Sequence, residues 1–169
     1  KGKIFGLDPS ETQIEAAIKR CNKLNNVKLL QLPANETGLK DNSVDIATST
    51  QTLEYIKDVD DAVIEIARVI KSQAKFVNVS ILWDHFKFHG PESSLNQLIH
   101  DAFKDHCHHQ MLPMELNMRL TRKGFENITS RGLPFLITKR HENSPAKFSE
   151  EVLARFALSK GVSEDKVFE

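Results

Sequence analysis

The sequence predicts an α/β fold whose strands are mostly parallel. In the first half of the chain, short apolar runs alternate with stretches in which apolar residues recur at helical spacing. This alternation is typical of a parallel sheet with helices on both faces. Beyond residue 82 two helical patterns follow one another without a strand between them. That change predicts a helical insertion after the fourth strand, and we expect it to cover the mouth of the ligand site.

Residues 1–82 form the expected core, in which each strand is an apolar run bounded by turn residues. A first helix follows Ser10, and a second begins after Asp58, which we expect to cap it. The four predicted strands lie at 3–7, 27–32, 44–50 and 75–81. The apolar positions that define the two helices are Ile14, Ala17, Ile18, Cys21 and Leu24, then Val59, Val63, Ile66 and Ile70.

The rest of the chain is predicted to complete one domain that spans 1–169. The helical insertion, 92–124, has its last helix ended by Gly124. In the C-terminal region, 125–169, we expect strands and then helices. The predicted elements there are strands at 126–131 and 134–139, a helix over 149–160 ended by Gly161, and a helix opened by Ser163.

Charge and composition argue against several classes of partner. Lys and Arg total 23 and Asp and Glu total 23, so the formal net charge is zero. A neutral chain offers no electrostatic footprint for nucleic acid or an anionic membrane. No apolar run approaches the roughly 18 residues of a membrane span, and no signal peptide is visible. We therefore expect a cytoplasmic protein without a membrane or nucleic-acid partner, in which Cys21 and Cys107 are small core residues.

Ligands of an open α/β sheet bind beyond the carboxyl ends of its strands, so residues that follow a strand are the candidate site residues. Asp8 follows the first predicted strand. A carboxylate at that point can accept hydrogen bonds from the hydroxyl groups of a ribose. The alternative is that Asp8, or Ser10 in its place, caps the helix that follows. Ala34, Thr50 and Trp83 mark the ends of the other predicted strands.

Three segments around these strand ends carry a more specific signal. They read Gly6-Leu7-Asp8-Pro9-Ser10, Leu39-Lys40-Asp41-Asn42-Ser43-Val44-Asp45 and Arg68-Val69-Ile70-Lys71. In this order and spacing, they resemble class I S-adenosylmethionine-dependent methyltransferases of the type 11 group. The resemblance implies a Rossmann-like sheet and transfer of a methyl group from S-adenosylmethionine to a small molecule. It covers residues 2–81, and Gly124-Phe125 also matches the family's usual final stretch.

The resemblance also implies roles for individual residues. Asp8 would bind the ribose of S-adenosylmethionine and Gln13 would contact its adenine. Ala34 and Asn35 would hold the adenine edge. With Pro9 and the strand-end residues Thr50 and Gln51, the full set of predicted cofactor-binding residues is Asp8, Pro9, Gln13, Ala34, Asn35, Thr50 and Gln51.

The candidate substrate-binding residues are Tyr55, Trp83 and His85, which follow the third and fourth strands. The stretch 81–85, with Leu112-Pro113, resembles small-molecule methyltransferases that have a helical lid here. His85 is a candidate general base, although a structural loop histidine is the alternative. Tyr55 can equally pack under the lid. Because positioning alone can supply much of the acceleration of methyl transfer, the sequence predicts no dedicated catalytic residue.

The sequence departs from the family pattern in three places. Pro33 replaces the acidic residue that usually precedes the alanine of the adenine loop, so adenine recognition would rest on backbone groups. The helix-to-strand turn reads Ser72-Gln73-Ala74 and lacks the family's glycines. The glycine-rich cofactor loop and its strand should precede Lys1. We therefore expect a partial domain with two unpaired strand edges, and poor solubility or weak cofactor binding of this chain alone.

Other interpretations remain open at this stage. A nicotinamide-dependent oxidoreductase would share the sheet and the ribose-binding acid, and an inactive methyltransferase-like fragment would share everything but the activity. Six of the seven histidines lie between His85 and His109, which suggests a metal site. Adjacent helical residues point about 100° apart, so His108 and His109 cannot easily share an ion, and we predict no metal.

Overall fold

The computed structural model describes residues 2–85, 93–134 and 144–168. Four strands and six α-helices occur in these ranges, together with three short 3-10 helices. The strands are β1 (Ile4–Leu7), β2 (Val27–Leu30), β3 (Val44–Thr50) and β4 (Ile70–Val79). The helices are α1 (Glu11–Cys21), α2 (Val59–Val69), α3 (Ser93–Phe103), α4 (Leu112–Arg122), α5 (Pro145–Ser159) and α6 (Glu164–Phe168), and the 3-10 helices are η1 (Leu53–Tyr55), η2 (Trp83–His85) and η3 (Lys104–His106).

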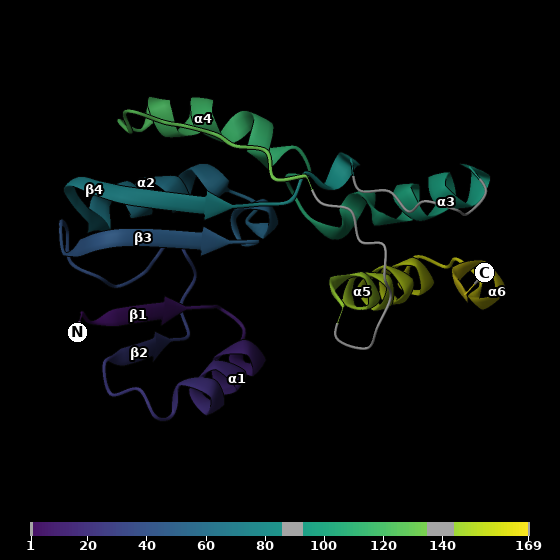
Figure 1. Ribbon diagram of the computed structural model, residues 1–169, viewed down its shortest axis with the longest axis horizontal. Coiled ribbons are helices and arrows are strands. Elements are labelled where there is room, and N and C mark those ends of the chain that lie inside the picture. The colour runs from purple at the N-terminus through teal and green to yellow at the C-terminus, as the bar shows by residue number, and fades with distance from the viewer. Residues whose placement is uncertain (1, 86–92, 135–143, 169) are drawn as a thin grey trace.

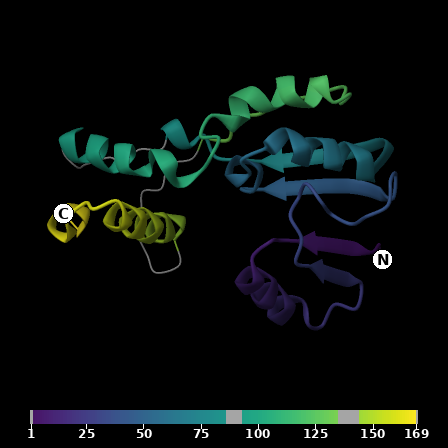
Figure 2. The same cartoon turned by 180° about the vertical axis from the view of Figure 1, so that it is seen from behind.

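The strands pair in two parallel couples. β1 pairs with β2 from Ile4 opposite Val27 to Leu7 opposite Leu30, and β3 pairs with β4 up to Thr50 opposite Val79. All four strands point the same way, and β1 and β3 lie on the facing sides of the two couples (Figure 1). The view from behind shows the same separation (Figure 2). The α/β class with parallel strands is therefore confirmed.

The facing edges of β1 and β3 make no strand pairing within the described residues. The side chains of these couples are unusually exposed for a parallel sheet, which normally has both faces covered. Ile46 of β3 is 61% exposed, and Val77 and Val79 of β4 are 49% and 47% exposed. These side chains leave much of the surface of β3 and β4 uncovered within the described residues.

The main core lies on one face of β3 and β4, beneath α2 and α4. Apolar residues of α2 and α4 meet there at helical spacing, and each is almost completely buried. Its most buried members are Leu53, Val59, Ala62, Val63 and Leu112. A second, smaller cluster contains Trp83, Phe103, Cys107 and Leu153 and joins η2, α3 and α5. This second cluster lies beyond the carboxyl ends of the strands, where α3, α5 and α6 are grouped (Figure 1).

The helix caps resolve one of the alternatives raised by the sequence. Ser10 is the N-cap of α1, and its hydroxyl accepts a hydrogen bond from the backbone N–H of Gln13 at 3.4 Å. Asp8 is therefore not the cap. Asp58 occupies the N-cap position of α2 as predicted, but its side chain makes no capping hydrogen bond. The N-cap position of Asp58 was therefore predicted correctly, but the expected capping by its side chain was not.

The strand predicted at 126–131 is wrong, because those residues form no helix or strand. Phe125 and Ile128 instead anchor an irregular segment against the main core. The strand predicted at 134–139 lies almost entirely outside the described residues. The helix predicted over 149–160 begins earlier, at Pro145, because Ser144 caps it through the N–H of Lys147 at 3.2 Å.

The turn between α2 and β4 shows the effect of the missing glycines. β4 begins at Ile70, but regular pairing with β3 starts at Lys75, because the register shifts between Val44 and Ile46. In this shifted stretch Gln73 has a φ of 65°, a left-handed conformation that side chains other than glycine rarely adopt. Gln73 adopts this left-handed conformation in place of a glycine, and its backbone is strained as a result.

Candidate functional site

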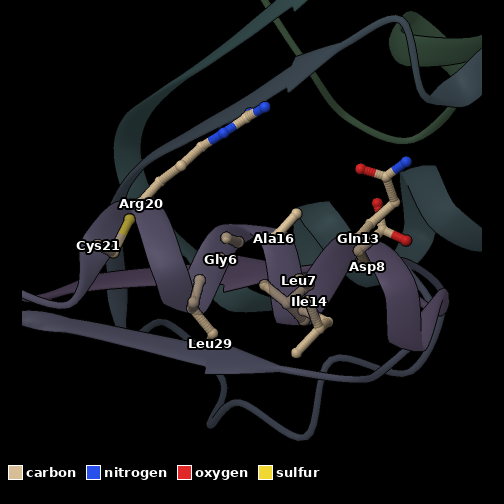
Figure 3. A pocket seen from close by; sticks show the side chains of 10 residues that line it. Gly6, Leu7, Asp8, Gln13, Ile14, Ala16, Arg20, Cys21 and Leu29 are labelled. Carbon is tan, nitrogen blue, oxygen red and sulfur yellow. The ribbon is translucent and has the colours of Figure 1, made fainter.

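The end of β1 places Asp8 at the carboxyl edge of the sheet. The N–H of Asp8 continues the parallel ladder by donating to the carbonyl of Leu30 at 3.3 Å. Oδ1 of Asp8 accepts from the N–H of Ser10 at 2.8 Å, which turns the chain into α1. Gln13 lies in the first turn of α1, and its polar end lies beside that of Asp8 (Figure 3). The two residues that the resemblance assigns to ribose and adenine are thus brought together.

A pocket of about 280 Å³ lies between β1 and α1. Its volume is just below the roughly 300–1,000 Å³ that is usual for pockets holding drug-sized ligands. A Cβ at Gly6 would lie 2.8 Å from Cδ2 of Leu29, so the Leu29 side chain would have to shift to admit one. The pocket is lined by Gly6, Leu7, Asp8, Gln13, Ile14, Ala16, Ala17, Arg20, Cys21 and Leu29.

The other predicted cofactor-binding residues do not line this pocket. Ala34 and Asn35 lie in a turn closed by the N–H of Glu36, which donates to the carbonyl of Pro33 at 3.1 Å. Ala34 packs against the main core, next to α2 and α4. The loop that leaves the β1–β2 couple therefore reaches across to the β3–β4 couple.

Thr50 and Gln51 end β3 at the same edge of the sheet. Gln51 has a φ of 48° and donates its N–H to the carbonyl of Val79 at 2.7 Å. The carbonyl of Thr50 accepts from the hydroxyl of Thr52 at 3.0 Å. Pro9 lies by the first strand end, where its carbonyl accepts from Nε2 of Gln31 at 3.5 Å. These contacts shape the turns at the strand ends, and the pocket lies on the β1–α1 side of that edge.

The predicted substrate-binding residues divide into two groups. Tyr55 and Trp83 belong to one aromatic cluster, because each makes an edge-on contact with the ring of His106, at centroid distances of 5.6 and 4.4 Å. His85 lies apart from that cluster, with 63% of its side chain exposed and its Nδ1 3.9 Å from Oδ2 of Asp84. The structure therefore brings Tyr55 and Trp83 together and leaves His85 outside their cluster.

The sequence did not single out His106 as a site residue, because it continues the apolar stripe of α3. Burial lowers the pKa of the His106 imidazole, although a hydrogen bond with the carbonyl of Phe103 opposes that shift. Burial and the nearby carboxylate of Glu54 raise the pKa of Tyr55 to about 12. Burial likewise raises the pKa of the Cys107 thiol to about 11, so this thiol is a poor nucleophile.

Glu54 is a second residue that the sequence did not reveal. It is completely buried, and its Oε2 accepts from the hydroxyl of Ser80 at 3.0 Å. Ser80 in turn accepts from Nδ2 of Asn78 at 2.9 Å. In the described residues, Oε1 of Glu54 has no hydrogen-bond partner. The sequence signal for this chain of hydrogen bonds is the pair of polar residues Asn78 and Ser80, two positions apart at the end of an apolar strand.

No group of three or more His, Cys, Asp or Glu side chains suited to a metal ion occurs within 2–85, 93–134 and 144–168. Across the same ranges, no helix has both the length and the apolar character needed to span a bilayer.

Comparison with known proteins adds to this geometry. A family model described as a methyltransferase domain matches residues 1–78. Residues 1–78 are therefore similar to the methyltransferase domain family. The matched segment contains Asp8, Gln13, β3 and all of β4 except its last residue, Val79.

The YcgJ protein of Bacillus subtilis has a similar fold, with a TM-score of 0.61 at 18% identity over 97% of this chain and 64% of that protein. The [4+2]-cyclase SpnF is 27% identical over 41% of this chain and 27% of its own, with a TM-score of 0.40. A 37.1 kDa uncharacterized protein of transposon TN4556 from Streptomyces fradiae is 25% identical over 96 residues. That match spans 28% of the length of the Streptomyces protein.

Proposed function

We propose that this methyltransferase domain uses S-adenosylmethionine and transfers its methyl group to a small molecule. The observation that carries the proposal is the position of Asp8, whose carboxylate lies with Gln13 at the rim of the pocket between β1 and α1. Such a carboxylate at the end of a strand is suited to the two hydroxyl groups of a ribose.

The residues present fit the proposed cofactor. One oxygen of Asp8 is used by the N–H of Ser10, and the second makes no hydrogen bond among the described residues. The amide of Gln13 can both donate to and accept from an adenine ring. Small side chains, at Gly6, Ala16 and Ala17, leave room for flat groups between β1 and α1. The chemistry that the bound cofactor supplies is an electrophilic methyl group on a sulfonium.

The residues of the chain bind and orient the two reactants. Asp8 and Gln13 hold the nucleoside part of the cofactor at the end of β1. Tyr55 and Trp83 lie beyond the carboxyl ends of β3 and β4, where the acceptor would bind. Holding a nucleophile in line with the methyl carbon supplies a large share of the acceleration, since it removes the entropic cost of bringing the reactants together.

The test is binding of S-adenosylhomocysteine, followed by NMR so that weak binding is also detected. Asp8→Asn keeps the acceptor for the N–H of Ser10 but removes the charge, and should weaken binding at least tenfold. Glu11→Gln makes the same charge change on the exposed first turn of α1 and should leave affinity unchanged. Equal loss in both variants, or none in Asp8→Asn, would remove the assignment of Asp8 to the ribose.

A further inference from the structure

His106 presents one unprotonated nitrogen in a defined direction. Its Nδ1 lies 3.1 Å from the carbonyl oxygen of Phe103. A carbonyl can only accept, so Nδ1 must carry the hydrogen, and in the neutral ring the lone pair is then on Nε2. The backbone of η3 therefore fixes the tautomer of this histidine.

The rest of the imidazole is covered. The ring of Phe103 stacks on it at a centroid distance of 3.6 Å and an interplanar angle of 15°. Trp83 meets it edge-on at 4.4 Å, and Phe156 of α5 does so at 6.3 Å. The Nε2 edge is left to contact a further group, and there it meets the hydroxyl of Tyr55 at 3.5 Å.

The contact between Tyr55 and His106 is open to exchange. A distance of 3.5 Å is long for a hydrogen bond from a hydroxyl, which is usually about 2.7–2.8 Å. Tyr55 is also 41% exposed, so molecules from solvent can approach its side of the cluster. A second hydroxyl that reached Nε2 at normal distance would form a stronger hydrogen bond than Tyr55 does.

The groups around Nε2 are neutral near pH 7. Burial lowers the pKa of His106 and raises that of Tyr55 to about 12, so the histidine is a free base and the tyrosine keeps its proton. Cys107, with its pKa raised to about 11, is also neutral. Of the charged groups nearby, Asp105 is paired with Lys160 at 2.9 Å, and Glu54 is bonded to Ser80.

We propose that Nε2 of His106 takes the proton from a phenolic methyl acceptor that binds beside Tyr55. The inference rests on the proposed function and names its acceptor class. Tyr55 supports the class, because its phenol shows that an aromatic hydroxyl fits against Nε2, and the acceptor's hydroxyl would displace that of Tyr55 from this nitrogen. The site lies at the correct edge of the sheet, since Tyr55 follows β3 and Trp83 follows β4.

The step balances without any further reactant. The acceptor oxygen forms a bond to the methyl carbon while the bond between that carbon and sulfur breaks, and the sulfur keeps the electron pair. The O–H bond of the acceptor breaks, and its proton passes to Nε2. One positive charge is thereby moved from the sulfonium to the imidazolium of His106.

The experiment uses 4-nitrophenol as the probe and NMR of the histidine side chains as the readout. In the wild-type chain at pH 7, the His106 ring should show a proton on Nδ1 and none on Nε2. Addition of 4-nitrophenol should shift the His106 ring resonances. His106→Asn should weaken binding of the probe at least tenfold, while His108→Asn, at an exposed site two residues away, should not change it.

Several results would overturn the proposal: a proton on Nε2 in the free protein, no shift of the His106 ring with the probe, or equal binding by His106→Asn. If His106→Asn does not fold, the tautomer and the probe-induced shift in the wild type decide the matter. Failure of the proposed function is distinguished by S-adenosylhomocysteine. If the chain does not bind S-adenosylhomocysteine but 4-nitrophenol still shifts the His106 ring resonances, the proposed cofactor is rejected. If S-adenosylhomocysteine binds and 4-nitrophenol causes no shift, only the role of His106 is rejected.

Discussion

The carboxylate of Glu65 accepts two hydrogen bonds from the guanidinium of Arg68, at 2.7 Å from Nε and 2.7 Å from Nη2. Glu65 is 8% exposed, and it also accepts from the N–H and the hydroxyl of Thr37, at 2.9 and 2.6 Å. Arg68 in turn donates to the carbonyl of Leu39 at 2.8 Å and pairs with Asp41. Together these contacts attach the loop after β2 to α2.

Replacing Glu65 with Gln should destabilise the fold by about 2–3 kcal/mol, because charge-assisted hydrogen bonds are lost and Arg68 keeps only Asp41 and the carbonyl of Leu39. Urea denaturation measures the change. Glu115→Gln is the matched control, since Glu115 pairs with Arg119 on the surface of α4 and its side chain is 43% exposed. The control should lose less than about 0.5 kcal/mol. Equal losses of unfolding free energy in the two variants would show that the buried hydrogen bonds of Glu65 stabilise the fold no more than an exposed ion pair does.

The same contacts predict an acid-dependent loss of stability. Hydrogen bonds from Arg68, above all, lower the pKa of Glu65 from 4.5 to about 2. Because the folded pKa is depressed, the stabilisation is complete above pH 4.5 and is lost as the pH falls toward 2. Denaturation between pH 5 and about 2 should therefore show a steeper decline for the wild type than for Glu65→Gln. Parallel curves would contradict the assignment.

Gln73→Gly should stabilise the chain by about 1 kcal/mol, because glycine adopts a positive φ without a Cβ clash. Gln73 is exposed, so the loss of its side chain removes little packing. Ser72→Gly is the control, since Ser72 is the neighbouring exposed residue and does not have a positive φ. There glycine should destabilise through backbone entropy. A destabilised Gln73→Gly variant would mean that the turn is not strained.

Lysine at Ile46 or Val77 should reduce self-association of the chain. Both side chains are about half exposed or more on an open sheet surface, at 61% and 49%, and charged residues discourage edge-to-edge pairing. Sedimentation velocity would measure the fraction of oligomer. Ile64→Lys, on α2 at 46% exposed, is a control with equal charge and similar exposure away from the strands. If Ile64→Lys has the same effect, charge alone and not the sheet explains the change.

The regular part of the fold could be predicted because its local signals agree with one another. The strand at 44–50 was predicted at its observed bounds, since its apolar run is enclosed by turn residues on both sides. The segment at 126–131 has a single apolar residue, Ile128, which packs against the core together with the preceding Phe125. The spacing of apolar residues indicates which residues are buried. It does not indicate whether their backbone pairs with another strand.

The candidate site was predictable where it depends on the order of residues along the chain. Asp8 was identified because a single position, the end of the first strand, determines where its carboxylate lies. His106 was missed because its role depends on a carbonyl three residues earlier and on Tyr55, 51 residues away in sequence. Glu54 was missed for the same reason, since its partner Ser80 is 26 residues distant.

The separation of β1 from β3 has a consequence for how the molecule comes apart. The unit made of β1, α1 and β2 contains contacts that are local in sequence, and in the described chain its sheet is not hydrogen-bonded to that of β3 and β4. Amide hydrogens in the two units should therefore exchange with deuterium through separate opening events, faster in the small unit. The hydrogen bonds of Glu65 with Thr37 and Arg68 would keep the two units joined while one of them is open.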